Sequence, residues 1–485
     1  RVTAKGGADG LRATVLVDDV APHADVRIPG ASRIDVTATR DGVMLVLETP
    51  ASEFGVLKGT VRSTRGIDWS DPGEWNQALE EAEIDGEAAL DIPNLTPLKR
   101  LVADVRHVAG RGRVVLRATG PVTAPKIEGG VTLDGLELKL AGELPPFEKG
   151  HVEATLLGEK LTIERLQGEL GYAPISLSGT YDRAGDGPPR LDLKLVGKNA
   201  QLVRNRHLRM RADVDLALAG PWDALVASGT VKVMDALYSR PMELFAKSAP
   251  AADNKLQLFS VRTEPFRSMK LDVKVEGDRS FRIRNNVIRG DFSLDLTVHG
   301  TGEVPEPRGT IFFRETLVKL PFSSLKVDRG EVTFTADDPF APKLNVASHT
   351  RMKGYDLNVL VEGTLPDVSV FISSKPTLSQ DDGVLLLTTG STRAELEGAG
   401  IGRAALTKIG AYFGKQLVQK VSGPSDPDER TLFDRFSFEM GRDISRTGQE
   451  TIEGEFELSK RYYLRGERDR YDDYNLGIVW RVRFK

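Results

Sequence analysis

The stretch 292-FSLDLTVHG-300 alternates apolar and polar residues with a period of two, as do 191-LDLKLVG-197, 271-LDVKVEG-277 and 357-LNVLVEG-363. This alternation is typical of a β-strand, because successive side chains of a strand point to opposite faces of its sheet. Each such strand carries an apolar face that something must cover. The pattern recurs along most of the 485 residues and predicts a chain that is nearly all strand.

The alternating segments also repeat at a fixed distance. Residues 204–220, RNRHLRMRADVDLALAG, and residues 284–300, RNNVIRGDFSLDLTVHG, share six residues at a constant offset of 80. Gly229 and Gly309 are the same distance apart, and each opens a further strand. A long fixed period of strands and turns is typical of a stacked array of repeats. We therefore expect an all-β body: an elongated sheet that curls into a half-open groove, with one amphipathic helix and a C-terminal β-hairpin segment.

The strongest helical pattern lies in residues 394–421. Its apolar residues recur at steps of three and four and form one stripe: Leu406, Ile409, Phe413, Leu417 and Val421. We favour a helix that docks on the open end of the sheet over one that lies on a membrane surface. Because no other segment predicts a helix convincingly, the sheet is expected to curl over its own apolar face or to hold a ligand there.

Composition and motifs argue against several classes of function. The net charge is −4, with 66 basic and 70 acidic residues intermixed, so no long-range field favours nucleic acid. The chain has no Cys, which excludes disulfides and thiolate metal sites, and its six His show no metal-ligand spacing. No nucleophile elbow or dinucleotide fingerprint is complete. We therefore predict no enzymatic activity, no catalytic or metal-binding residues and no cofactor.

One basic stretch has two interpretations. Its residues are Lys198, Arg204, Arg206, His207, Arg209 and Arg211, echoed by Arg279, Arg282, Arg284 and Arg289. They could hold lipid phosphates at the rim of a groove. The interpretation we favour is a solvated face, because a repeat copies its solvent-exposed side together with its core.

The last sixty residues are predicted to form longer strands than the repeats. The final one, within 471-YDDYNLGIVWRVRFK-485, alternates to its end and is similar to the closing strand of outer-membrane barrels. Three hairpin strands are too few for a closed membrane barrel, which needs about eight. A free edge that pairs with a partner's sheet is the consistent use. The residues predicted to dock the partner are Asn475, Leu476, Gly477, Ile478, Trp480, Val482 and Phe484.

Two further motifs complete a family resemblance. The repeat body, 377-TLSQDDGVLLLTTGST-392, and the C-terminal 438-FEMGRDI-444 and 458-LSKRYYLRGERD-469 resemble the C-terminal portion of the TamB family, which belongs to the AsmA-like group of diderm bacteria. The resemblance implies a periplasmic β groove that carries phospholipids between the inner and outer membranes, with its C-terminus at a TamA-type outer-membrane barrel. It also implies a longer protein with an N-terminal anchor in the inner membrane, of which this sequence would be a C-terminal fragment.

The predicted organisation has three parts: a β groove over residues 1–375, a connecting segment with the helix over 376–423, and barrel-like docking strands over 424–485. The groove is expected to hold phospholipid acyl chains on the residues Leu191, Leu193, Leu195, Val214, Leu216, Leu218, Val231, Val233, Leu271, Val273, Val275, Phe292, Leu294, Leu296, Val298, Ile311, Phe313, Leu357, Val359 and Val361. The alternative function is a scaffold that helps outer-membrane barrels assemble with a TamA-type barrel. A self-packed solenoid, such as an adhesin passenger, is the least favoured.

Overall fold

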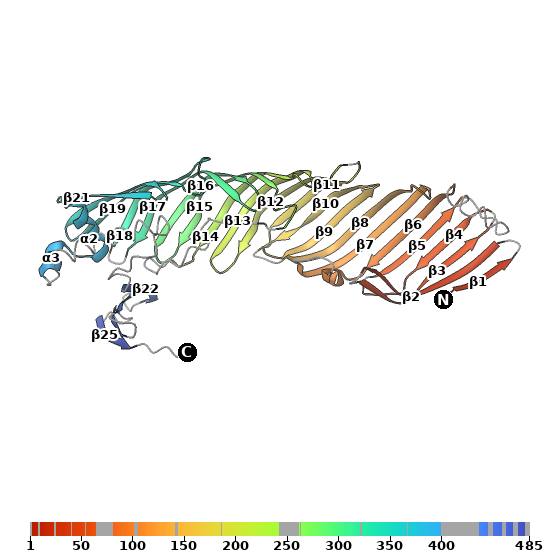
Figure 1. Cartoon of the computed structure of the whole chain (residues 1–485), viewed down its shortest axis with the longest axis horizontal. Helices are drawn as coiled ribbons and strands as arrows, with labels where there is room; N and C mark the ends of the chain where they lie inside the picture. The colour runs from red at the N-terminus through yellow and green to blue at the C-terminus, as the bar shows by residue number, and fades with distance from the viewer. Residues whose placement is uncertain are drawn as a thin grey trace. The chain divides into compact units, whose positions relative to one another are not determined.

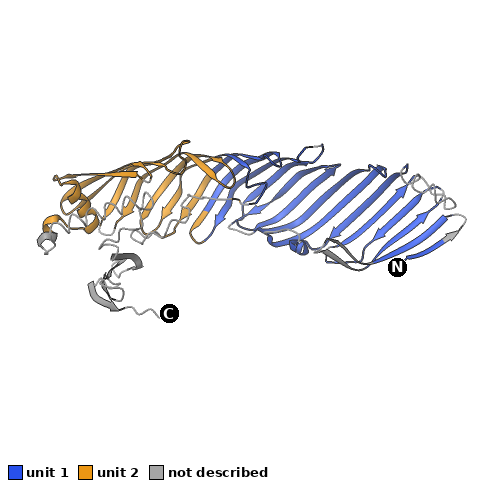
Figure 2. Cartoon of the chain, in the orientation of Figure 1, with its two compact units in different colours: residues 1–205, 210–232, 262–273 blue, residues 206–209, 233–261, 274–485 orange. Residues whose placement is uncertain are grey.

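The computed structural model describes most of the chain up to residue 398 and four strands between residues 436 and 480. The residues before 398 that it does not describe are 1, 8–9, 24–25, 40, 54, 65–80, 101–104, 141–143, 186, 242–260, 262, 321–322 and 366. The described chain is mostly β, as the alternation predicts, with a 21-stranded sheet that is not closed and a separate four-stranded sheet. The chain divides into two compact units, shown in Figure 2.

Unit 1 comprises residues 1–205, 210–232 and 262–273. Its strands are β1 (Val2–Gly7), β2 (Gly10–His23), β3 (Val26–Ala38), β4 (Val43–Glu48), β5 (Val56–Ser63), β6 (Glu83–Ile92), β7 (Val105–Pro121), β8 (Lys126–Leu140), β9 (Phe147–Leu157), β10 (Lys160–Leu170), β11 (Pro174–Asp182), β12 (Arg190–Arg204) and most of β13 (Leu208–Pro221). From β1 to β12 each strand pairs antiparallel with the next along the chain, which Figure 1 shows as a meander.

Unit 2 comprises residues 206–209, 233–261 and 274–485. The unit boundary runs through β14 (Val226–Tyr238) and β15 (Lys270–Arg284). The remaining strands of the large sheet are β16 (Ile288–Gly300), β17 (Pro305–Lys319), β18 (Ser324–Phe334), β19 (Lys343–Met352), β20 (Tyr355–Thr364) and β21 (Asp367–Lys375), paired antiparallel in chain order. The four-stranded sheet contains β22 (Phe436–Ile444), β23 (Glu450–Glu457), β24 (Tyr462–Arg468) and β25 (Tyr474–Trp480).

The repeat seen in the sequence corresponds to three strands. Strands β12 to β14 and strands β15 to β17 occupy equivalent positions 80 residues apart. Asn199 and Arg279, one in each copy, have φ of 51° and 48°. The backbone N–H of Asn199 donates to Asp213 Oδ1 at 2.7 Å, and that of Arg279 donates to Ser293 Oγ at 2.9 Å. In each copy, therefore, the backbone N–H of the residue with positive φ is hydrogen-bonded by a side chain of the following strand, and that side chain stands at the same position of the repeat.

The third strand of one copy and the first of the next run in the same direction. At their beginnings the Lys270 N–H donates to Leu225 O at 2.9 Å. At their far ends the side-chain amide of Asn285 donates to Arg240 O at 3.1 Å. An odd number of antiparallel strands would reverse every second copy. Strands β14 and β15 therefore run parallel, and the second copy is not reversed.

The helices correct the sequence prediction. The structure has α2 (Gln380–Thr389), which the sequence pattern missed, and α3 (Arg393–Gly398). Ser379 caps α2 by accepting the Asp382 N–H at 3.1 Å, and Gly390 ends the helix with φ of 70°. Of the helix predicted over 394–421, only the residues of α3 are described, and 399–421 lie outside the described residues. The run VLLL inside α2 has no amphipathic spacing, so its periodicity does not reveal a helix.

Candidate functional site

Strand register aligns apolar side chains in rows across unit 1. One row crosses eleven strands through residues that are paired strand by strand: Val15, Ile34, Leu47, Gly59, Ala88, Leu116, Gly129, Leu156, Leu161, Tyr181 and Leu191. A second row contains Leu57, Leu90, Val114, Val131, Ala154, Ile163, Gly179 and Leu193, and a third contains Ile92, Gly112, Leu133, Val152, Leu166, Leu177 and Leu195. We call these three rows the apolar ladder. Because paired residues lie on the same side of a sheet, the ladder forms one face.

Many residues on the ladder's face keep part of their surface exposed. Leu116 is 38% exposed, and Leu45, which lies on the same face two residues before Leu47, is 37% exposed. Leu193 and Leu195 are half-buried. A short 3₁₀ helix, η2 (Thr96–Arg100), together with Leu95 covers part of the third row between β6 and β8. Among the described residues of unit 1, no other helix lies over the ladder.

The opposite face of unit 1 is charged and paired. Arg117 on β7 donates two hydrogen bonds to the Asp85 carboxylate on β6, each of 3.2 Å. Lys194 on β12 lies 3.4 Å from the Asp215 carboxylate on β13. The Asp85 carboxylate raises the pKa of Arg117 by hydrogen bonding and by its charge. These pairs alternate with ladder positions along each strand, so one face is solvated and the other is apolar.

In unit 2 the corresponding face is partly filled by the protein itself. Helix α2 packs Leu386 and Leu387 against Leu357 and Val359 of β20, and all four side chains are buried. Leu386 is 0% exposed and Leu357 is 1% exposed. Val361, Val370 and Ile372 also contact this cluster, while Phe292 of β16 and Phe313 of β17 pack with ring centroids 4.9 Å apart. Strands β20 and β21 thus bury their apolar face under α2.

Polar contacts hold α2 in place on the sheet. The Gln380 side chain donates to Val370 O at 2.6 Å and accepts the Ile372 N–H at 2.9 Å, as a neighbouring strand would on β21. Ser323 Oγ donates to Leu387 O at 3.0 Å. The two Gln380 bonds occupy backbone groups of β21, the last described strand of the large sheet, which would otherwise form a free edge.

The turn after α2 is fixed by an ion pair. Arg393 Nε lies 2.5 Å from Asp382 Oδ1, and Asp382 Oδ2 also accepts the Ser379 hydroxyl at 2.6 Å. Partial burial acts to raise the pKa of Asp382, but the Ser379 and Arg393 hydrogen bonds outweigh it and hold the pKa below its ordinary value. The carboxylate form of Asp382 therefore stabilises the first turn of α2.

None of the twenty side chains predicted to line a lipid groove is exposed. Nine are buried: Leu191, Val214, Val233, Leu271, Phe292, Leu296, Val298, Leu357 and Val359. Eleven are half-buried: Leu193, Leu195, Leu216, Leu218, Val231, Val273, Val275, Leu294, Ile311, Phe313 and Val361. The rows of unit 1 contain three of them, and α2 contacts Leu357, Val359 and Val361. The alternation of β20 gives no sign that these last three are covered by a helix.

The residues predicted to dock a partner lie partly in β25. Strand β25 contains Asn475, Leu476, Gly477, Ile478 and Trp480 and pairs with β24, with Leu464 opposite Ile478. Among the described strands, β25 has no second neighbour and is the last of the four-stranded sheet. Val482 and Phe484 lie outside the described residues.

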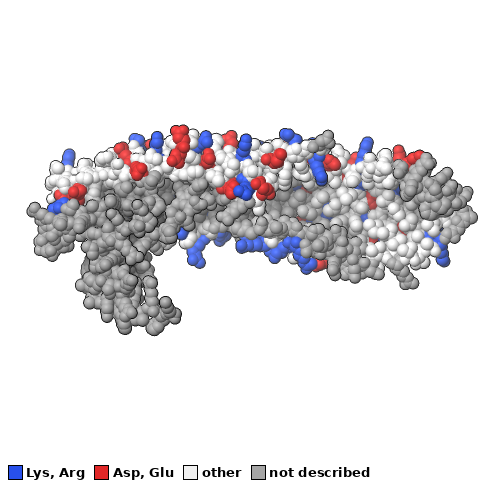
Figure 3. Space-filling view, viewed as in Figure 1, with Lys and Arg blue, Asp and Glu red and all other residues white. Residues whose placement is uncertain are grey.

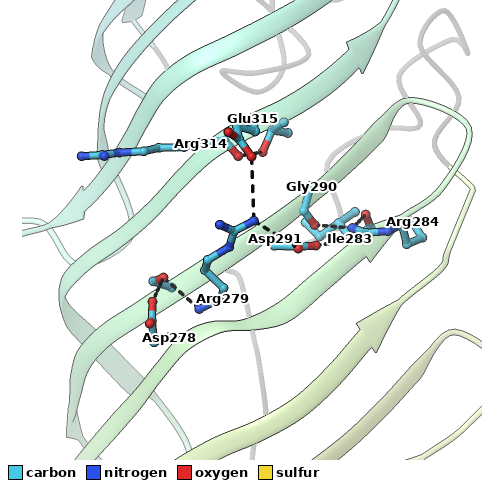
Figure 4. A network of polar contacts seen from close by, with 10 residues as sticks. Asp278, Arg279, Ile283, Arg284, Gly290, Asp291, Arg314 and Glu315 are labelled. Carbon is cyan, nitrogen blue, oxygen red and sulfur yellow. Dashed lines mark hydrogen bonds and ion pairs between the residues drawn. The ribbon is translucent and has the colours of Figure 1, made fainter.

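Three arginines of the basic stretch form ion pairs with carboxylates. Figure 4 shows Arg284 directed at Asp291 and at Gly290 O, which it reaches at 2.6 Å. Arg279 lies 3.8 Å from Asp291 and 4.0 Å from Glu315, and Arg282 bonds Asp235. These ion pairs agree with the interpretation that we favoured from the sequence, in which the arginines belong to a solvated face. In Figure 3 basic residues gather along the lower edge of the view, whereas basic and acidic residues alternate along the upper edge.

Comparison with known proteins identifies the family. Residues 164–484, more than half of the chain, match the family model described as the TamB C-terminal domain. Neither the curated proteins nor the solved structures give a match. No helix in the described residues is long and apolar enough to cross a membrane. The resemblance inferred from the sequence is thereby confirmed, and the chain belongs to the TamB family, whose members are non-enzymatic transport and assembly proteins of the cell envelope that act with TamA.

Proposed function

We propose that the chain is a periplasmic conduit that carries phospholipid acyl chains along its apolar face between the inner and outer membranes. The observation that supports this function most is the apolar ladder, whose first row crosses eleven consecutive strands with the Tyr181 hydroxyl as its single polar group. An ordinary sheet of this size buries such a face under helices or a second sheet. In unit 1 the described residues supply only η2 and Leu95 for that purpose.

The energetics of the ladder suit acyl chains. Each buried methylene contributes about 0.8 kcal/mol, so a dozen methylenes would stabilise a bound chain by about 10 kcal/mol before ordering costs. An aliphatic lining offers no directional contacts, which lets a chain move along it. The path proposed here excludes Leu357, Val359 and Val361, because α2 already occupies that part of the face.

Arginine on the ladder's face tests the proposal. Leu45→Arg with Leu116→Arg places two charges at positions that are each more than a third exposed, so the guanidinium groups can reach water and the fold is retained. The charges would interrupt the acyl-chain path, because an unpaired charge is costly beside hydrocarbon. We expect phospholipid co-purified from a diderm host, measured by mass spectrometry, to fall several-fold.

The matched control uses the opposite face of the same region. Met44→Arg with Thr132→Arg adds the same charge on the opposite face. Each of these residues lies next to a ladder-face residue along its own strand and therefore points the other way. Lipid content should remain at the wild-type level in this variant. Undiminished lipid in a folded Leu45→Arg, Leu116→Arg protein would contradict the conduit and favour the scaffold function.

The second candidate function is a scaffold for outer-membrane barrel assembly, and it is favoured by the position of β25. A last strand with one neighbour among the described strands can add a strand from a partner's sheet. We propose that a TamA-type barrel is that partner and that Trp480 is the anchor. Deletion of residues 475–485 should abolish retention by the purified barrel while lipid co-purification persists. Barrel retention by the truncated chain would remove β25 from the docking role.

A further inference from the structure

Two aromatic side chains, Tyr181 and Trp222, meet at one end of the strands in unit 1. Their ring centroids are 6.2 Å apart, and the ring planes are nearly perpendicular, at 86°. Tyr181 is the second-to-last residue of β11, and Trp222 directly follows the last residue of β13. We call these two residues the aromatic pair.

The aromatic pair lies on the same face of the sheet as the apolar ladder. Tyr181 belongs to the first row, where it stands opposite Leu191 of β12. Asp215 of β13 contacts Lys194 on the charged face, so the residues next to Asp215 along β13 lie on the ladder's face. The ring contact with Tyr181 places Trp222 on that face as well. Acyl chains on the ladder would therefore adjoin both rings.

Each ring combines an apolar body with one hydrogen-bond donor, the phenol hydroxyl of Tyr181 or the indole N–H of Trp222. Among the described residues, neither side-chain donor has a hydrogen-bond partner. Trp222 is 41% exposed, and Tyr181 is half-buried. Tyrosine and tryptophan are enriched where hydrocarbon meets the polar region of a bilayer, because the ring contacts the chains and the donor reaches the polar groups.

The ladder's face is exposed at the end of the strands where the aromatic pair lies. Ile127 pairs with Ala118 one step beyond the first row and is 40% exposed. At the opposite end of β10 and β12, Leu170 and Ala200 are buried. The protein's own side chains thus fill the face of these two strands at the end away from the aromatic pair.

Charges around the aromatic pair are balanced. Two acidic and two basic residues stand at the end of β11, at the start of β12 and next to Trp222: Asp182, Arg183, Arg190 and Asp223. A site with balanced charge has little basis for selecting a head group by its charge. All diacyl phospholipids share the ester carbonyl oxygens, which are acceptors that a hydroxyl and an indole N–H can bind.

We propose that the aromatic pair binds the ester region of a phospholipid whose acyl chains lie along the ladder. The proposal rests on the conduit function and adds to it an orientation of the lipid. The glycerol and the head group lie at the aromatic pair, and the methyl ends of the chains point toward the second and third rows. The two side-chain donors bond to ester carbonyl oxygens, and the rings pack against the first methylenes.

Fluorescence of Trp222 tests the orientation. The chain has four Trp, so replacing Trp69, Trp75 and Trp480 with Phe leaves Trp222 as the single emitter. This variant is loaded from vesicles of phosphatidylcholine that carries bromine on its acyl chains, and the vesicles are then removed. We expect bromine next to the ester to quench Trp222 several-fold more strongly than bromine near the methyl end.

An ether lipid tests the two donors, because it has no ester carbonyl. Short-chain diacyl phosphatidylcholine should bind the wild type about tenfold more tightly than the dialkyl analogue below the micelle concentration, the effect of two hydrogen bonds. Tyr181→Phe with Trp222→Phe should bind both lipids equally. Tyr172→Phe with Trp480→Phe is the matched control, since Tyr172 directly precedes β11 at the opposite end of the strand and is 78% exposed. It should keep the preference for the ester.

The outcomes separate the proposal from the conduit function. Bound lipid that quenches Trp222 equally from both bromine positions, more strongly from the methyl end, or not at all would overturn the orientation and leave the conduit standing. Equal affinity of the wild type for ester and ether lipids, or an ester preference that persists without the aromatic pair, would overturn the role of the two donors. If neither lipid bound the wild type, the conduit function itself would fail.

Discussion

Truncation of Leu386 tests whether α2 is an integral cover of the sheet. The side chain is 0% exposed and lies in one cluster with Leu357, Val359 and Leu387. Leu386→Ala removes three carbon atoms from this cluster and leaves a cavity. For a fully buried leucine the transfer and cavity contributions together amount to about 3 kcal/mol. The loss falls on α2 and on strands β20 and β21, because the cluster joins only these elements and their immediate neighbours.

Hydrogen exchange measured by mass spectrometry reports this loss locally. A reduction of about 3 kcal/mol in the opening free energy speeds amide exchange by about 100-fold in peptides that cover residues 380–389. Phe371→Ala is the control, because Phe371 lies on the uncovered face of β21 and is 55% exposed. It should change exchange in α2 by less than threefold. If Leu386→Ala left α2 as protected as in the wild type, or if Phe371→Ala had the same effect, the packing argument would be refuted.

Two further predictions concern backbone geometry and charge. Gly309→Ala should lower the melting temperature measured by circular dichroism, because its φ is 116° and a Cβ would lie 2.3 Å from Asp295 O, whereas Gly187→Ala, with open space around it, should not. The lowered pKa of Asp382 means that its contribution to α2 is present above the unfolded value of about 3.8 and is lost as pH falls through the folded value. Asp382→Asn should therefore speed amide exchange in α2 at neutral pH and remove the loss of protection at acid pH. If exchange in α2 of this variant kept the wild-type dependence on pH, the role of the ion pair with Arg393 would be contradicted.

The strands were predictable because period-two alternation is a local signal that the sheet enforces. Leu191, Leu193 and Leu195 alternate with charged residues in the sequence and fall in three successive rows of the ladder. The glycines of the repeat were also informative, since Gly229 and Gly309 have φ of 126° and 116° and each lies against a backbone carbonyl of the preceding strand. The irregular residue of the β16–β17 bulge was not predictable: the register shifts between Arg289 and Asp291, and the residue with positive φ is Glu315 on β17, at 51°, which no neighbouring glycine or proline marks.

Helix α2 was missed because its stability comes from contacts that are distant in sequence. Its own residues include Gly383 and two threonines, and its apolar run has no helical stripe. Burial of Leu385, Leu386 and Leu387 and the bonds from Gln380 to β21 compensate for this weak propensity. The ion pairs of Arg282 with Asp235 and of Arg284 with Asp291 were equally invisible, because whether a carboxylate lies opposite a given arginine depends on strand register and not on the composition of the segment.

The direction of the repeats links the fold to the charge at the strand ends. Each copy has three strands, so a tight turn between copies would point the second copy the opposite way and carry its R-N-x-x-x-R turn to the other end of the sheet. Lys270, the first residue of β15, instead bonds to Leu225 O beside the start of β14, so the two strands are parallel and both motifs open a strand at the same end. A scaffold that needed only a stable sheet would gain nothing from this arrangement, because hairpin turns close antiparallel strands with fewer residues. A conduit, in contrast, would present the same end of every repeat along one side of its path.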